Sequence, residues 1–203
     1  HRLQGIKHDC RIRAILDGET VAEAEDEILF TGYGISGPAS LKISRKINEL
    51  VLGNKSPEIL INLFPGMDKE SLLQLLNTLW ADSGKKISFS LLGILKERLP
   101  EVILETAGID SERRAGTLTE KEKLIIADTL MDLRLTPGSP RGFEEAVAAA
   151  GGVSTDEINP LTMESKIVAG LYITGELLDI DGDSGGINLQ FAWSTGAIAG
   201  MRQ

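Results

Sequence analysis

The chain has 203 residues, of which 42% are hydrophobic and 25% charged, proportions that are ordinary for a soluble globular protein. Its net charge of −9 argues against a nucleic-acid-binding protein, and no apolar run reaches the roughly 20 residues that cross a bilayer. The single cysteine, Cys10, excludes an internal disulfide and favours a reducing compartment. We therefore expect a cytoplasmic protein with neither a nucleic-acid nor a membrane partner.

The first thirty residues predict β-structure. Apolar residues alternate with polar ones over 9–16, which is the two-residue period of a half-buried strand. Asp17-Gly18 is a good hairpin turn, so residues 20–24 are predicted as the return strand and 28–31 as a further short strand.

A change of period after Gly34 predicts a helix. Ser36 is the expected N-cap and Pro38 lies near the first turn, while Gly53-Asn54 ends the apolar pattern. Residues 59–64 predict another strand. Further helical patterns cover residues 68–80, 87–107 and 119–133, the last opened by a Thr-x-x-Glu capping box.

The C-terminal part changes character near residues 140–145, where we place a domain boundary. A small-residue helix is predicted over 142–150, and it ends in Gly151-Gly152-Val153. Beyond it, a short apolar strand from Lys166, an acidic turn and the pair Gly185-Gly186 lead into a final helix.

This strand-turn-helix pattern is typical of sites for phosphates and dinucleotides. Glycines let backbone N–H groups approach a ligand, and a helix N-terminus supplies unpaired donors and partial positive charge. A nucleotide-cofactor site is therefore the leading hypothesis. In the structural alternative, Gly185-Gly186 only forms a turn and the acidic residues only keep the loop solvated.

A calcium loop overlaps the same segment. Asp179, Asp181 and Asp183 alternate like the first ligands of such a loop. The sixth position is Ser184 instead of glycine, however, and the twelfth is Gln190 instead of glutamate, so we assign no metal site.

Acid–base chemistry is sparse in the sequence. Only His1 and His8 are present, and His8 falls on the polar face of a predicted strand, where we expect a solvated side chain. No catalytic residue is assigned, which suits a protein whose reaction is carried by a cofactor.

Several motifs occur together in one order along the chain. They are Phe30-Thr-Gly-Tyr-Gly-Ile-Ser-Gly-Pro38, Ala149-Ala-Gly-Gly-Val153, Thr162-Met-Glu-Ser-Lys166, Gly170-Leu-Tyr-Ile-Thr-Gly-Glu-Leu-Leu-Asp179 and Gly185-Gly-Ile-Asn-Leu-Gln190. The set resembles the bacterial NAD(FAD)-utilising dehydrogenases, or aminoacetone oxidase family, over essentially the whole chain.

The resemblance implies an α+β fold in which a Rossmann-like FAD-binding domain is interrupted by an insert with a β part and a helical part. Residues 1–143 would be this insert, which covers the substrate, and 144–203 the C-terminal strand-turn-helix portion of the FAD domain. The implied cofactor-binding residues are Gly151, Gly152, Val153, Gly175, Glu176, Asp179, Gly185, Gly186, Ile187, Asn188 and Leu189. The family commonly has an aromatic residue where this chain has Ile187.

The resemblance also predicts a truncated flavoprotein. The first half of the FAD domain, with its Gly-x-Gly-x-x-Gly turn, is not among the 203 residues, so we expect little activity from this chain alone. The parent protein would be an FAD-dependent oxidoreductase that passes hydride or electrons through the flavin. Its donor would be NAD(P)H or a small organic substrate. The alternative is a non-catalytic interaction or oligomerisation module, in which the apolar strand 167–173 pairs with a second copy.

Overall fold

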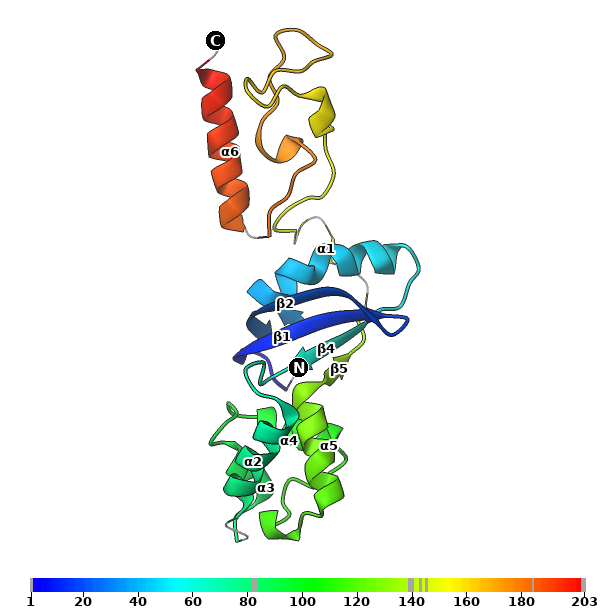
Figure 1. The fold of residues 1–203 in the computed structure, drawn as a ribbon, viewed down its shortest axis with the longest axis vertical. Helices are drawn as coiled ribbons and strands as arrows, with labels where there is room; N and C mark the ends of the chain where they lie inside the picture. The colour runs from blue at the N-terminus through cyan, green and yellow to red at the C-terminus, as the bar shows by residue number, and fades with distance from the viewer. Residues whose placement is uncertain are drawn as a thin grey trace. The chain divides into compact units, whose positions relative to one another are not determined.

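The chain divides into two units, unit 1 (His1–Ser139) and unit 2 (Pro140–Gln203), and each is described here by itself. The computed structural model describes residues 2–81, 84–138, 141–142, 144, 146–183 and 185–201. Unit 1 combines a sheet with helices, and unit 2 combines loops with one long helix (Figure 1).

Unit 1 contains one antiparallel sheet with the strand order β3-β2-β1-β4-β5. Its strands are β1 (Lys7–Leu16), β2 (Glu19–Phe30), β3 (Ile35–Ser36), β4 (Glu58–Asn62) and β5 (Leu133–Leu135). Asp17 and Gly18 both have positive φ, the geometry of the tight turn that joins two strands with matching twist. The hairpin is confirmed, but the two strands predicted over 20–24 and 28–31 are one continuous strand, β2.

Helix α1 (Pro38–Leu52) covers one face of the sheet (Figure 1). Ser36 is not its N-cap, because this residue pairs with Leu29 in β3. The N-cap is Gly37, which has φ of 90° and makes no side-chain cap. A Cβ atom there would lie 2.9 Å from the Glu27 carbonyl oxygen, so the chain needs glycine to turn from strand to helix. The buried face between α1 and the sheet is formed by Cys10, Ile12, Ala14, Ala24, Ile28, Phe30, Ala39, Ile43 and Ile47.

The helical part of unit 1 contains α2 (Lys69–Trp80), α3 (Ile87–Leu91), α4 (Leu99–Thr106) and α5 (Glu120–Met131). The predicted helices are confirmed, with Asp68 as the N-cap of α2. Helix α5 ends at Met131 instead of Leu133, because the chain passes directly into β5 beside β4. The interior is formed by Leu72, Leu76, Trp80, Ile87, Leu91, Leu99, Ile103, Leu104, Ile126 and Leu130.

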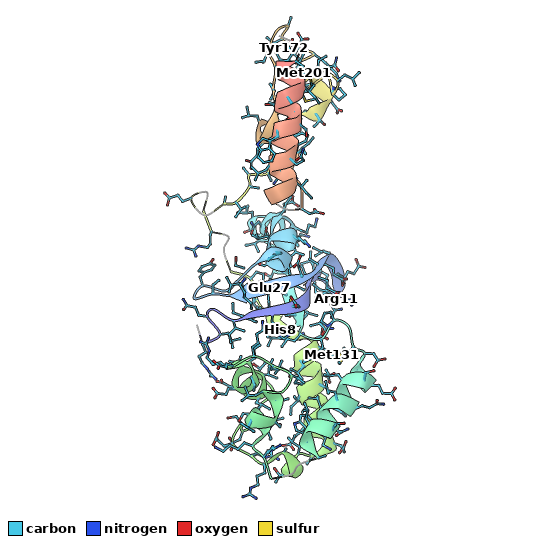
Figure 2. The ribbon with its side chains drawn as sticks, turned by 90° about the vertical axis from the view of Figure 1, so that its left-hand side faces the viewer. His8, Arg11, Glu27, Met131, Tyr172 and Met201 are labelled. Atoms are coloured by element: carbon cyan, nitrogen blue, oxygen red, sulfur yellow. The ribbon has the colours of Figure 1, made fainter. Side chains whose placement is uncertain are left out.

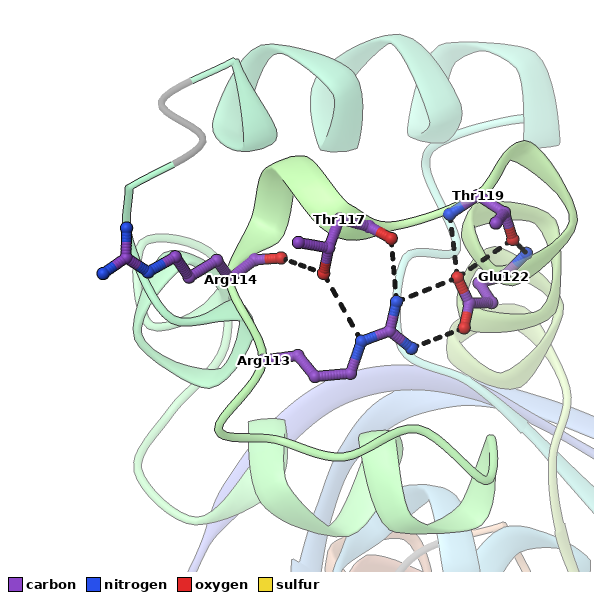
Figure 3. Close-up of polar contacts among 5 residues, drawn as sticks. All are labelled: Arg113, Arg114, Thr117, Thr119 and Glu122. Carbon is purple, nitrogen blue, oxygen red and sulfur yellow. Dashed lines mark hydrogen bonds and ion pairs between the residues drawn. The ribbon is translucent and has the colours of Figure 1, made fainter.

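An arginine joins the start of α5 to the preceding loop (Figure 3). Arg113 Nη1 lies 2.5 Å from Glu122 Oε1, and Arg113 Nη2 donates to the Thr117 carbonyl at 2.8 Å. Glu122 also accepts from the Thr119 backbone N–H, and the Thr119 hydroxyl accepts in return from the Glu122 N–H. The predicted capping box is therefore present and is reinforced by a cation.

Unit 2 departs most from the sequence prediction. Its elements are the short turns η3 (Thr155–Glu157) and η4 (Gly175–Leu177), and the helix α6 (Gly185–Gly200). Residues 146–150 form no helix, and Phe143 and Glu145 lie outside the described residues. The predicted strand 167–173 is absent as an extended element. Only residues 171–173 pair with 163–165, through the bridge Tyr172–Glu164 and its two flanking backbone hydrogen bonds, and residues 167–170 form turns and bends. A single bridge does not make a strand of this length.

The ion pair at Glu122 predicts an acid-sensitive contribution to stability. The Arg113 guanidinium, together with the Thr119 cap, lowers the pKa of Glu122 from 4.5 to about 2. A carboxyl whose pKa is lowered in the folded state stabilises the fold above its unfolded pKa and loses that contribution as the pH falls. We expect the stability difference between wild type and Glu122→Gln to be full above about pH 4.5 and to shrink toward about pH 2.

Urea unfolding at a series of pH values measures this difference. Glu112→Gln is the matched control, because Glu112 pairs with Lys86 at the surface and should matter little. A wild-type advantage that does not change with pH would contradict the assignment.

Candidate cofactor site

The Gly151-Gly152-Val153 segment lies beside Leu177–Asp179 in parallel orientation. Val153 N donates to the Leu177 carbonyl at 2.8 Å, and Asp179 N donates to the Val153 carbonyl at 2.9 Å. Gly152 makes this approach possible, since a Cβ atom there would lie 2.6 Å from the Leu177 oxygen. Glycine at this position therefore serves the contact between two backbone segments.

Helix α6 is attached to the same region through Gly175. The Gly175 N–H donates to Thr195 Oγ1 at 3.0 Å, and this hydroxyl donates to the Phe191 carbonyl at 2.7 Å. Gly175 has φ of 62°, and a Cβ atom there would lie 3.3 Å from Ala192 Cβ. The positive φ and this tight contact both favour glycine at the turn. The sequence analysis missed Thr195, which is buried; in the sequence nothing distinguishes it from the other polar residues of the helix, Asn188, Gln190 and Ser194.

Glu176 connects the turn to the segment before the glycine pair. Its Oε1 accepts from the Ala149 backbone N–H at 2.6 Å. The residue is exposed. One oxygen of Glu176 therefore joins the turn to the segment before Gly151, and the exposed carboxylate also faces solvent.

The first turn of α6 contains backbone donors that have no partner within the helix itself. The first N–H groups of any α-helix lack partners within the helix, and here they belong to Gly185, Gly186 and Ile187. No acidic side chain lies in this turn to occupy them. The Asn188 side chain accepts from the Gly182 N–H at 2.6 Å, which holds the acidic turn against the helix. A Cβ atom at Gly185 would meet nothing within 4 Å, so this end of the helix is open.

Two of the predicted cofactor segments, 151–153 and 175–179, therefore lie side by side, through the pairs Val153–Asp179 and Glu176–Ala149. The third, 185–189, is the start of α6, and the same helix contacts Gly175 further along, at Thr195. Ile187 and Leu189 are exposed. The binding of a cofactor by these residues stays a prediction.

An apolar cavity of about 320 Å³ lies between α6 and the loops of unit 2. Its walls include Ile158, Met163, Leu178, Phe191, Thr195 and Ile198. Met163 has φ of 62° although it is not glycine, and it is buried at this wall. The unit thus has apolar surface on the inside of its loops that its own side chains do not fill.

Other candidate chemistry from the sequence finds no site among the described residues. No group of three His, Cys, Asp or Glu residues there is placed to hold a metal ion, and Ser184 of the calcium alternative lies outside them.

His8 is not a solvated surface group as expected; its Nε2 lies 2.9 Å from the Leu63 carbonyl, and its ring packs edge-on against Phe64. Burial raises the pKa of the Cys10 thiol to about 12, so this group is unreactive at neutral pH. Within the described part of the chain, no helix has the length and apolar character to cross a membrane.

Gly152→Ala should disrupt the parallel pairing, because the added methyl group would meet three backbone atoms of residues 177–179 within 3 Å. We expect the Asp179 amide to lose hydrogen-exchange protection. Gly151→Ala is the matched control: it also replaces a glycine with positive φ, but its Cβ would meet nothing within 4 Å. Retained protection of the Asp179 amide in Gly152→Ala would contradict the close approach.

Thr195→Val should weaken the attachment of the turn to α6. The substitution keeps the shape but leaves the buried Gly175 N–H without an acceptor, which costs about 1–3 kcal/mol. We expect faster exchange of the Gly175 amide, measured by NMR. Ser194→Ala, at an exposed position of the same helix, should leave that rate unchanged; equal effects of both substitutions would refute the role of Thr195.

Comparison with known sequences matches residues 1–148 to the family model described as "HI0933-like protein barrel and H2TH domain". The chain is 34% identical over 197 residues to 3-dehydro-bile acid delta(4,6)-reductase of Clostridium scindens, covering 97% of this chain and 48% of the relative. It is 32% identical over 184 residues to ribosomal RNA dihydrouridine synthase of Escherichia coli, covering 91% and 44%.

The protein of the same name from Haemophilus influenzae is 33% identical over 171 residues, covering 84% of this chain and 40% of the relative. The chain thus spans about half the length, or less, of these curated relatives. The mixed antiparallel sheet and helices of unit 1 agree with a barrel followed by a helical domain. Through residues 1–148, the chain belongs to the HI0933-like family.

Proposed function

We propose that this chain is part of a flavin-dependent oxidoreductase that uses FAD. In this proposal residues 1–143 are the insert over the substrate, and residues 144–203 are the C-terminal portion of a Rossmann-like FAD-binding domain. Family membership and relatives about twice as long support the proposal.

The main observation in support of the proposal is the apolar composition and the exposure of α6. The helix contains no charged residue, and its apolar side chains point to all sides. Only Thr195 and Ala199 are buried, whereas Trp193 is 68% exposed and Leu189 is 56% exposed. A helix that is apolar all round belongs in the interior of a larger fold. If further strands of the FAD-binding domain pack against α6 in the parent protein, unit 2 without them would show this exposure and the unfilled cavity beside the helix.

The residues at the start of α6 fit an anionic cofactor. The N–H groups of Gly185, Gly186 and Ile187 can donate to a phosphate or to a flavin carbonyl, and the helix dipole favours negative charge there. Glu176 keeps one oxygen for a ligand hydroxyl, and Asp179 offers an exposed carboxylate. Gly152 would act indirectly, by holding Asp179 in place through the parallel pairing.

The names of the relatives indicate the class of reaction. One is a reductase of delta(4,6) bile acids, and the others form dihydrouridine; both names describe the addition of two hydrogens to a conjugated carbon–carbon double bond. When bound and reduced, FAD would supply hydride chemistry, with NAD(P)H as the source of its electrons. The chain's own residues would bind and orient the flavin and the substrate, and would shield them from water.

Titration with FAD, followed by flavin fluorescence, tests the proposal on the chain itself. We expect saturable binding in the micromolar range, because the first turn of α6, which is the proposed half-site, lies within this chain. Gly185→Asp should lower the affinity about tenfold or more, since a carboxylate would face the phosphates at the helix start. The same charge favours the helix itself, so this loss would not reflect unfolding.

Gly185→Asn is the matched control, because it has the same shape without the charge and should bind nearly as the wild type does. Absence of FAD binding by the wild type would contradict a preformed site. If it were accompanied by association of the chain at rising concentration, the second candidate, a non-catalytic oligomerisation module that uses the exposed face of α6, would be favoured.

A further inference from the structure

A second cavity lies within unit 1, where the sheet meets the helical part. It has a volume of about 640 Å³, is open to solvent, and is lined by His8 of β1 and by residues 92–97, which belong to the α3–α4 connection. Figure 2 shows His8 between β1 and the helical part. Small-molecule sites in proteins have volumes of roughly 300–1,000 Å³, so this cavity has the size of such a site.

One ring nitrogen of His8 is held by the protein and the other is not. Because a carbonyl oxygen can only accept, Nε2–H donates to the Leu63 carbonyl at 2.9 Å. The Phe64 ring packs edge-on against the imidazole and supports its orientation. Nδ1 of the neutral ring is then an acceptor, and no donor of the described residues bonds to it. A histidine held in this way through one nitrogen can accept a hydrogen bond from a ligand hydroxyl with the other.

The α3–α4 connection supplies hydrogen-bond donors to the lining. The backbone N–H groups of Gly93, Lys96 and Glu97 have no acceptor in the part of the chain that the structure describes. Among the same residues, the Lys96 ammonium has no carboxylate partner. The exposed Glu97 carboxylate is screened by solvent, so it opposes a bound anion less than the four donors favour it. Leu92 and Ile94 add apolar surface.

The connection is held in place without a ligand. The Leu95 side chain is buried in the core of unit 1. Arg98 has φ of 68°, which is uncommon for a residue other than glycine, and its guanidinium donates to the Arg2 carbonyl at 2.8 Å and to the Gln4 carbonyl at 3.0 Å. These bonds tie the end of the connection to the segment that leads into β1, the strand that carries His8. The cavity is therefore formed in advance, as most small-molecule sites are.

We propose that this cavity binds a small apolar molecule that carries a hydroxyl group and a carboxylate. The hydroxyl donates to His8 Nδ1, and the carboxylate accepts from the Lys96 ammonium and from the N–H groups of the connection. Leu92 and Ile94 contact the apolar body. The site does not depend on the proposed flavin function, because all of its residues lie in unit 1.

NMR spectra of the 203-residue chain titrated with para-hydroxyphenylacetate test the proposal. We expect saturable shifts of the Gly93, Lys96 and Glu97 amide signals, with a Kd on the order of 1 mM or below. Phenylacetate lacks the hydroxyl, and para-hydroxyphenylacetamide lacks the charge. Each should bind the wild type about fivefold or more weakly, since each forgoes one group of hydrogen bonds.

Two variants connect each loss to a residue. His8→Gln keeps a donor for the Leu63 carbonyl, because the glutamine amide nitrogen can replace Nε2, but it removes the acceptor Nδ1. This variant should no longer distinguish para-hydroxyphenylacetate from phenylacetate, and Lys96→Met should no longer distinguish the acid from its amide. Lys121→Met is the matched control; it removes an exposed lysine of α5 outside the cavity and should bind as the wild type does.

Three results would overturn the proposal. One is the absence of saturable shifts at residues 93–97 with about 10 mM para-hydroxyphenylacetate. Another is shifts at Phe191 and Thr195 instead, which would place the compound in the apolar cavity of unit 2. The third is equal binding of the three compounds by the wild type, a comparison that holds even where a substitution disturbs the fold.

Discussion

Helix α6 imposes the constraint on which unit 2 depends. Sixteen residues without a charge, apolar on every side, require cover on every side, because each exposed apolar side chain forgoes stabilisation of about 25 cal/mol per Å². The described chain supplies cover on one side only, through Thr195 and the turn at Gly175. On the function proposed above, further strands of the FAD-binding domain would supply the remaining cover, and the cofactor would lie at the first turn of the same helix.

Unit 1, in contrast, covers its apolar surfaces with its own elements. Its sheet has α1 over one face and a ladder of ion pairs on the other, and its helices share one continuous interior with the sheet. The start of α5 is also capped within the unit. There the Glu122 carboxylate takes part both in the capping box and in the ion pair with Arg113. A family model that ends at residue 148 is consistent with this difference between the two units.

The fold could be predicted from the sequence wherever neighbouring residues decide it. The period of the apolar residues and the turn at Asp17-Gly18 determine β1 and α1, and the Thr-x-x-Glu box determines the start of α5. Predictions were wrong where contacts distant in sequence decide. Of the predicted strand 167–173, only 171–173 pair with a neighbouring segment, 163–165. Ser36 pairs with Leu29 in β3, which leaves Gly37 as the cap of α1. The close contact at Gly152 also depends on Leu177, which is distant in sequence and which no local pattern predicts as a neighbour.

The candidate site shows why a glycine motif is an ambiguous signal. Gly152 and Gly175 are needed for contacts within the protein, with Leu177 and Ala192, whereas Gly185 faces open space. All three fit the same sequence pattern, but only the last lies in the first turn of a helix, where backbone N–H groups have no partner within the helix. The chemistry of a bound anion would therefore concentrate at Gly185, and the other glycines would act by fixing the geometry of the segments around it. In a cofactor site of this kind, Gly185 would contact the cofactor, and Gly152 and Gly175 would hold the surrounding backbone segments in position.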